Sequence, residues 1–194
     1  MLIERPMVFL DLEATGISPY QDRIVEIAFL KRFPDGREDF FGSLINPQRP
    51  MPKESMAVHH ITDEMVAQSP SFSQIAERAF LFLDNCDLGG FGIIKFDVPL
   101  LASEFSRSGF FFSTDGRRVV DALTIYHRME PRNLEAAYRF YCGKTLDGAH
   151  RAEADTRAAA EVFRAQLARY EAVPKDLDDL SDWCRRHTGV RRSS

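Results

Sequence analysis

The chain has 194 residues, of which 44% are hydrophobic and 28% are charged, and its formal net charge is -4. This length and composition are typical of an ordinary globular protein with one sizeable core. The acidic balance argues against a protein that holds nucleic acid mainly through a broad basic face, although positive charge could still be supplied by metal ions.

The cysteines and the apolar runs indicate where the protein works. Cys86, Cys142 and Cys184 are odd in number and form no C-x-x-C pair, so a disulfide framework and a zinc knuckle are disfavoured and a reducing compartment, the cytoplasm, is expected. The apolar run of residues 7–10 is too short for a secretory signal. No apolar stretch approaches the roughly 20 residues that a membrane span requires.

The first half of the chain predicts strands and then a helix. "PMVFLDLE", residues 6–13, is typical of a buried strand. Residues 22–33 and 40–47 predict a second and a third strand, antiparallel to each other and joined at an Asp-Gly turn. A polar, proline-rich loop follows, and residues 69–85 predict a helix whose Ser71 and Gln74 have the spacing of a capping box.

The second half alternates short strands with helices. Residues 87–93 and 117–123 predict the strands, and residues 98–109, 133–143 and 153–170 predict the helices, the second of which begins at Asn133 and ends at Gly143. The order of elements predicts a mixed α/β sheet flanked by helices. We expect one domain over residues 1–170 and a C-terminal extension over 171–194, with a short amphipathic helix and a basic tail. The tail is expected to be solvated, although its four arginines could touch phosphates.

Carboxylates stand where the predicted strands end. Asp11 and Glu13 are two residues apart on one strand, so their side chains point to the same side with Cα atoms ~6.6 Å apart. Asp155 lies at the head of a helix on its apolar stripe, where a buried carboxylate needs a partner. Asp97 and Asp121 each precede a helix and could instead be helix N-caps, and for Asp121 we favour the cap. His150, on a loop five residues before Asp155, is suited to proton transfer.

These motifs resemble a known family in both order and spacing. "FLDLEATG", "GGFGIIKFDVPLL" and "GAHRAEADTRAAAEVF" are similar to the three motifs of the DEDDh branch of the DnaQ-like 3′→5′ exonucleases, a family that includes the proofreading exonucleases of bacterial DNA polymerase III. "INPQRPMPKESMAVHHITDEMV" resembles a further stretch of the family, with His60 where glycine is usual. The similarity covers roughly residues 5–170.

The resemblance implies a fold, an activity and a site. The fold would be ribonuclease-H-like, with a five-stranded mixed sheet flanked by helices. The activity would be hydrolysis of single-stranded nucleic acid from its 3′ end, DNA favoured over RNA, with release of nucleoside 5′-monophosphates. Two divalent ions, Mg²⁺ or Mn²⁺, would be held by four carboxylates, and a histidine would be the general base. The implied roles are metal ligand for Asp11, Glu13, Asp97 and Asp155, general base for His150, and substrate contact for Leu12, Thr15, Gly16 and His59.

The implied partners are nucleic-acid 3′ ends and a DNA polymerase or another replication or repair protein. One departure concerns Gly92, which stands where relatives usually carry asparagine. The missing amide predicts a weaker hold on the substrate, and Gly92→Asn should lower KM provided that the backbone does not require glycine. Two other interpretations stay open: a non-catalytic nucleic-acid- or polymerase-binding module with the same fold, and a protein whose acids are only caps and surface charges.

Overall fold

The computed structural model describes residues 4–149 and 151–187. It contains two compact units, one up to residue 127 and the other from residue 128 onward. These units are defined by their internal contacts, whereas the predicted boundary at residue 170 rests on the sequence pattern. The domain over residues 1–170 therefore stays a prediction. No helix in the described ranges is long and apolar enough to cross a membrane.

The first unit contains a five-stranded mixed sheet in the order β3-β2-β1-β4-β5. β1 pairs antiparallel with β2, β2 pairs antiparallel with β3, and β1, β4 and β5 run parallel. The predicted strands are therefore confirmed, although β3 begins two residues before its predicted start. The strands are β1 (Met7–Ala14), β2 (Ile24–Arg32), β3 (Glu38–Leu44), β4 (Asp87–Gly90) and β5 (Val119–Asp121).

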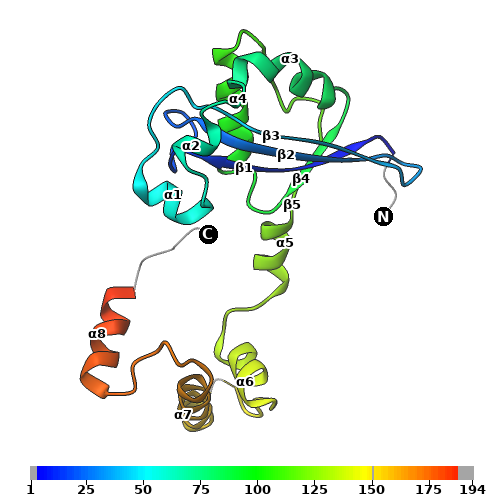
Figure 1. Ribbon diagram of the computed structural model, residues 1–194. Coiled ribbons are helices and arrows are strands. Elements are labelled where there is room, and N and C mark those ends of the chain that lie inside the picture. The colour runs from blue at the N-terminus through cyan, green and yellow to red at the C-terminus, as the bar shows by residue number, and fades with distance from the viewer. Residues whose placement is uncertain (1–3, 150, 188–194) are drawn as a thin grey trace. The chain divides into compact units, whose positions relative to one another are not determined.

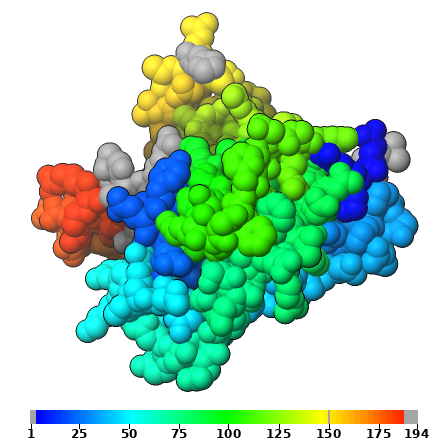
Figure 2. Space-filling model, turned by 90° about the horizontal axis from the view of Figure 1, so that it is seen from above, coloured from blue at the N-terminus to red at the C-terminus, as the bar shows by residue number. Residues whose placement is uncertain are grey.

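Two helices cover one face of this sheet, α3 (Phe72–Phe82) and α4 (Asp97–Arg107) (Figure 1). Alternate residues of β1 point toward them, so Val8, Leu10 and Leu12 are buried in the main core. The predicted capping box at the start of α3 is present, because Ser71 and Gln74 satisfy each other's backbone N–H groups. In Figure 2 the surface of α4, in green, lies beside the blue segment that connects β1 to β2.

Two short helices follow β3, α1 (Lys53–His59) and α2 (Asp63–Val66). Both helices are too short to show a helical repeat in the sequence. The sequence pattern therefore predicts only a polar loop between the third strand and the helix at residues 69–85. Met51, Ile61 and Val66 form a small separate cluster with Val25 of β2. This cluster fixes the connection between β3 and α3 against the sheet.

The remaining helices are α5 (Ala122–Met129), α6 (Leu134–Cys142), α7 (Ala152–Arg169) and α8 (Leu177–His187). The predicted ends of α6 are confirmed: Asn133 is its N-cap, and Gly143 ends it in a left-handed conformation with φ of 67°. α6 and α7 of the second unit share a core of Tyr138, Ala158 and Val162. α8 confirms the predicted amphipathic helix of the extension, and residues 188–194 of the tail lie outside the described residues.

Candidate active site

Asp11 and Glu13 lie near the carboxyl end of β1, on the face opposite α3 and α4. The alternation of the strand places them there, because Leu10, Leu12 and Ala14 fill the core on the other face. Asp11 is exposed and Glu13 is half-buried. Burial raises the pKa of Glu13, and the charges of Asp11, Glu26 and Asp97 raise it further.

Asp97 reaches the same strand from α4. It is the first residue of that helix rather than its N-cap, which is Phe96, so the capping interpretation is wrong for this residue. Its Oδ1 accepts a hydrogen bond from the Leu12 N–H at 3.1 Å, and only 7% of the residue is exposed. Burial, with the charge of Asp11, raises the pKa of Asp97 to about 6. The carboxylate is therefore placed directly behind the Asp11-Leu12-Glu13 segment.

These three carboxylates form a region of unfavourable negative charge in the first unit. The charge of Asp11 raises the pKa of both Glu13 and Asp97, and the charge of Asp97 raises the pKa of Glu13 as well. Among the described residues, however, no three His, Cys, Asp or Glu side chains converge on one point as a ready-made metal cage. The first unit thus supplies hard oxygen donors that favour a cation, and any complete cage needs further ligands.

Glu26 on β2 also faces these carboxylates, and no sequence motif predicted it. It is the direct cross-strand neighbour of Glu13, and like charges in such a pair destabilise the sheet. Its charge raises the pKa of Glu13 and opposes the lowering of the pKa of His59 that burial causes. Only the register of β1 against β2 reveals this neighbour, because nothing in the local sequence distinguishes Glu26 from a surface acid.

The predicted substrate contacts belong to the end of β1, to the turn that follows it and to α1. Thr15 is fully buried at the end of β1, and Gly16 follows it. The Leu12 side chain belongs to the core, so its backbone is the part that faces the carboxylates. His59 ends α1; its Nδ1 accepts the Ile61 N–H at 3.0 Å, and its buried Nε2 has no hydrogen-bond partner within the described part of the chain.

Asp155 belongs to the second unit. It lies in the first turn of α7 and is half-buried, and the stripe predicted for this helix is confirmed for Ala158 and Val162. Ala159, expected on the same stripe, is exposed. His150 lies outside the described residues. The ligand role of Asp155 and the base role of His150 therefore stay predictions.

Asp121 holds the loop that contains Gly92. Its carboxylate accepts hydrogen bonds from the N–H groups of Gly92 and Ile94, and also from Leu123 at the start of α5 as the N-cap interpretation predicts. Burial alone would raise the pKa of Asp121, but these hydrogen bonds outweigh it and lower the pKa. Gly92 has φ of 84°, which favours glycine. The loop after β4 is thus held by hydrogen bonds to Asp121.

Comparison with known proteins gives one family over most of the chain. The RNase_T family model, described as Exonuclease, matches residues 8–163. The DNA polymerase III subunit epsilon of Treponema pallidum (strain Nichols) is 30% identical over 165 residues, which are 82% of this chain and 75% of that protein. The DNA polymerase III subunit epsilon-like protein of Rhodobacter capsulatus is 32% identical, over 85% of this chain but only 24% of its own length.

Solved structures of exonuclease I share the fold. E. coli exonuclease I in complex with a dT13 oligonucleotide has a TM-score of 0.59 at 17% identity, covering 95% of this chain and 44% of that one. A zinc-bound form of the E. coli exonuclease I–ssDNA complex has a TM-score of 0.57 at 17% identity, over 95% of this chain and 43% of that one. The chain spans less than half of these proteins. With the observed sheet order, this likeness confirms the ribonuclease-H-like fold.

Proposed function

The chain belongs to the exonuclease family, in its DnaQ-like 3′→5′ branch, and from this premise we propose that it hydrolyses single-stranded nucleic acid from the 3′ end. The products are nucleoside 5′-monophosphates. DNA is the favoured substrate and RNA the alternative. The observation that carries this proposal is the group of Asp11, Glu13 and Asp97 around one strand end, at an energetic cost that only a cation or a proton removes.

The oxygen donors present suit divalent cations, and we propose that two such ions bind here. Asp11, Glu13 and Asp97 offer oxygen atoms, which Mg²⁺ and Mn²⁺ prefer, and Asp155 is the proposed fourth ligand on the basis of its motif. Bound ions would stabilise negative charge on the phosphodiester and lower the pKa of the attacking water. The hydrogen bond from the Leu12 N–H holds the Asp97 carboxylate in place, and the pairing of β1 with β2 fixes Asp11 and Glu13.

The proposed base is His150, which would take the proton of the attacking water on an imidazole nitrogen. His150→Ala should reduce turnover by roughly 10²- to 10⁴-fold, the usual contribution of general-base catalysis. Metal affinity, measured by titration calorimetry, should change little because His150 is not a proposed ligand. If metal affinity fell as much as turnover, His150 would be a metal ligand and not the general base.

The activity is tested with end-labelled substrates. Single-stranded DNA, single-stranded RNA and a mismatched primer end are incubated with Mg²⁺, with Mn²⁺ or with EDTA. We expect mononucleotide release that EDTA abolishes and that a blocked 3′-hydroxyl slows strongly. Cleavage of a circular single strand would contradict an exonuclease, and binding without cleavage would support the alternative of a non-catalytic nucleic-acid- or polymerase-binding module.

The ligands are tested by charge removal. Asp11→Asn and Asp155→Asn should each remove nearly all activity, because either change weakens the hold on the cations. Asp115→Asn, on an exposed turn of the first unit, is the matched control and should have wild-type activity. Wild-type turnover in either test variant would remove that residue from the ligand set.

The names of the relatives also suggest a cellular process and a protein partner. We propose that 3′ ends reach this domain during replication or repair, with a DNA polymerase or a related protein as partner, because two of the relatives are named as epsilon or epsilon-like proteins of DNA polymerase III. The cytoplasm is the proposed location, since its reducing conditions suit the free thiols of Cys86, Cys142 and Cys184. Co-purification from cells at native expression level tests the partner.

A further inference from the structure

The turn that follows Glu13 is held by an unusual density of polar contacts. Thr15 is fully buried, and its Oγ1 donates to Asp22 Oδ1 at 2.9 Å and accepts the Arg23 N–H at 3.1 Å. The other oxygen of Asp22, Oδ2, accepts the Ser18 N–H at 2.9 Å. Asp22, near the end of the segment between β1 and β2, is thus hydrogen-bonded to Thr15 and Ser18 near its start.

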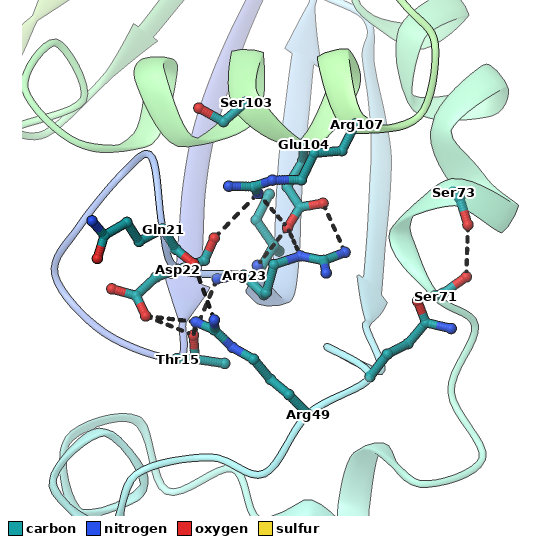
Figure 3. Close-up of polar contacts among 12 residues, drawn as sticks. Thr15, Gln21, Asp22, Arg23, Arg49, Ser71, Ser73, Ser103, Glu104 and Arg107 are labelled. Atoms are coloured by element: carbon teal, nitrogen blue, oxygen red, sulfur yellow. Dashed lines mark hydrogen bonds and ion pairs between the residues drawn. The ribbon is translucent and has the colours of Figure 1, made fainter.

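An arginine from a distant segment completes this arrangement. Arg49, which follows β3, donates from Nη2 to Thr15 Oγ1 at 2.5 Å and to Asp22 Oδ1 at 2.7 Å (Figure 3). Its Nη1 donates to the Gln21 carbonyl at 3.0 Å. One guanidinium thus contacts three residues of the turn in a fork geometry that a lysine cannot reproduce. We call Thr15, Asp22 and Arg49 the turn clamp.

Gly16 belongs to the same construction. A Cβ atom at this position would lie 2.6 Å from Asp22 Oδ2 and 2.8 Å from its Cγ, distances that real Cβ atoms essentially never show. Glycine is needed here because the Asp22 carboxylate lies directly against the backbone. The conformation of the Thr15-Gly16 pair therefore depends on the Asp22 carboxylate of the clamp.

The far side of the connection is fixed to α4. Arg107 donates to the carbonyls of Tyr20 at 2.5 Å and Asp22 at 3.2 Å. Glu104, which is 1% exposed, lies between Arg107 and Arg23, with N–O distances of 3.2 and 2.6 Å. The turn is thus held from two directions, by the Arg49 segment and by the helix that begins with Asp97.

We propose that Arg49 and Asp22 are positioning residues that hold the Thr15-Gly16 turn in the shape that receives the 3′-terminal nucleotide. The inference rests on the proposed function. Asp11 and Glu13 are held separately by the pairing of β1 with β2, so the clamp holds the turn and not these two carboxylates. Loss of the clamp should therefore raise KM while turnover and metal affinity change little.

A direct role makes the opposite prediction for one variant. Arg49 has a side-chain exposure of 40%, so its charge could attract a phosphate without any clamp. If that were its role, Asp22→Asn would free the guanidinium and remove a negative charge, and KM would fall. If the clamp matters, Asp22→Asn removes an ionic acceptor from Arg49 and KM rises. The sign of the change in KM separates the two roles.

The experiment compares steady-state kinetics of Arg49→Lys, Asp22→Asn and the double variant on one single-stranded oligonucleotide. We expect KM to rise by roughly 2- to 13-fold per hydrogen bond lost, with kcat within about twofold of wild type. The double variant should show less than the product of the two single effects, since both act through one clamp. The matched controls are Arg37→Lys and Asp39→Asn, an exposed arginine–aspartate pair at the β2–β3 turn, and both should leave KM unchanged.

Hydrogen–deuterium exchange of the wild-type and variant proteins without substrate gives a second readout. The peptide that spans residues 15–23 should exchange faster in both clamp variants and at the wild-type rate in both controls. A lower KM for Asp22→Asn, or an unchanged rate of amide exchange in residues 15–23, would overturn the proposed positioning role. If wild-type protein degrades no substrate, the proposed function fails by itself, and the exchange result still decides whether the clamp holds the turn.

Discussion

At the scale of single residues, the candidate site places a carboxylate where burial opposes its charge. Asp97 is 7% exposed and its pKa is raised to about 6, with burial as the main cause and Asp11 as the next. The folded, metal-free protein therefore holds a proton at Asp97 more tightly than the unfolded chain does. The contribution of this residue to stability is present below about pH 4 and is lost as pH rises toward 6.

Asp97→Asn should therefore stabilise the metal-free protein at neutral pH. The amide keeps an oxygen that can accept the Leu12 N–H, and it removes the buried charge. A shift from 3.8 to about 6 corresponds to a gain on the order of 2–3 kcal/mol in the free energy of unfolding. Urea unfolding with EDTA measures it: the difference between variant and wild type should grow from pH 4 to pH 6 and then level off. A difference that does not depend on pH would contradict the prediction.

The backbone at Gly92 limits what an asparagine could achieve there. With φ of 84° and a Cβ that would lie 3.4 Å from Leu123 Cδ2, this position favours glycine. Gly92→Ala should lower the free energy of unfolding by roughly 1–2 kcal/mol, and Gly92→Asn by less, because asparagine tolerates this conformation better. Thermal and urea unfolding of the two variants check the order. The strain opposes any improvement in KM that the new amide brings.

At the scale of elements, helix ends show which local rules the chain obeys. α6 begins and ends at residues that suit each position, Asn133 and Gly143. The C-cap of α1 is instead His60, a non-glycine residue with φ of 60° in the left-handed region. This conformation favours glycine, because an L-residue pays a steric cost there that glycine does not.

His60→Gly should stabilise the protein slightly. The left-handed conformation costs an L-residue about 1–2 kcal/mol, and the greater freedom of glycine in the unfolded chain costs roughly 0.5–1 kcal/mol. The expected net gain is about 0.5–1 kcal/mol in the free energy of unfolding, measured by urea denaturation. His60→Ala is the control and should show no such gain, because alanine has the same conformational penalty.

At the scale of the whole molecule, charge limits how nucleic acid can be held. The chain has 29 acidic and 25 basic residues, so it has no general attraction for phosphates. Several arginines of the first unit are already paired, with Asp87, Glu104 and Asp22 among their partners. Substrate binding should therefore depend on the cations of the site and on a small number of direct contacts.

Catalytic efficiency should for this reason depend only weakly on salt. If the protein neutralises no more than about three phosphates, a plot of log(kcat/KM) against log[KCl] at constant Mg²⁺ should have a slope no steeper than about -2. Assays from 50 to 300 mM KCl measure the slope on a single-stranded oligonucleotide. A slope near -5 would instead reveal a basic surface that the composition does not suggest.

The amino-acid sequence by itself determined most elements and the identity of the acids. The order of strands and helices follows from alternation, helical periodicity and capping residues, which are local properties of the chain. Asp11 and Glu13 could be paired from their spacing alone, since alternate residues of a strand share a face. The family could be recognised because its motifs are short, ordered stretches of sequence.

Only the tertiary structure decided which distant residues meet. Glu26 opposite Glu13 depends on strand register, the Asp97 bond to Leu12 depends on how α4 packs on the sheet, and Arg49 reaches Asp22 across 27 positions of sequence. No local pattern encodes such contacts, because packing of the whole unit brings them together. The burial that raises the pKa of Asp97 is likewise a property of the assembled core and of no short segment.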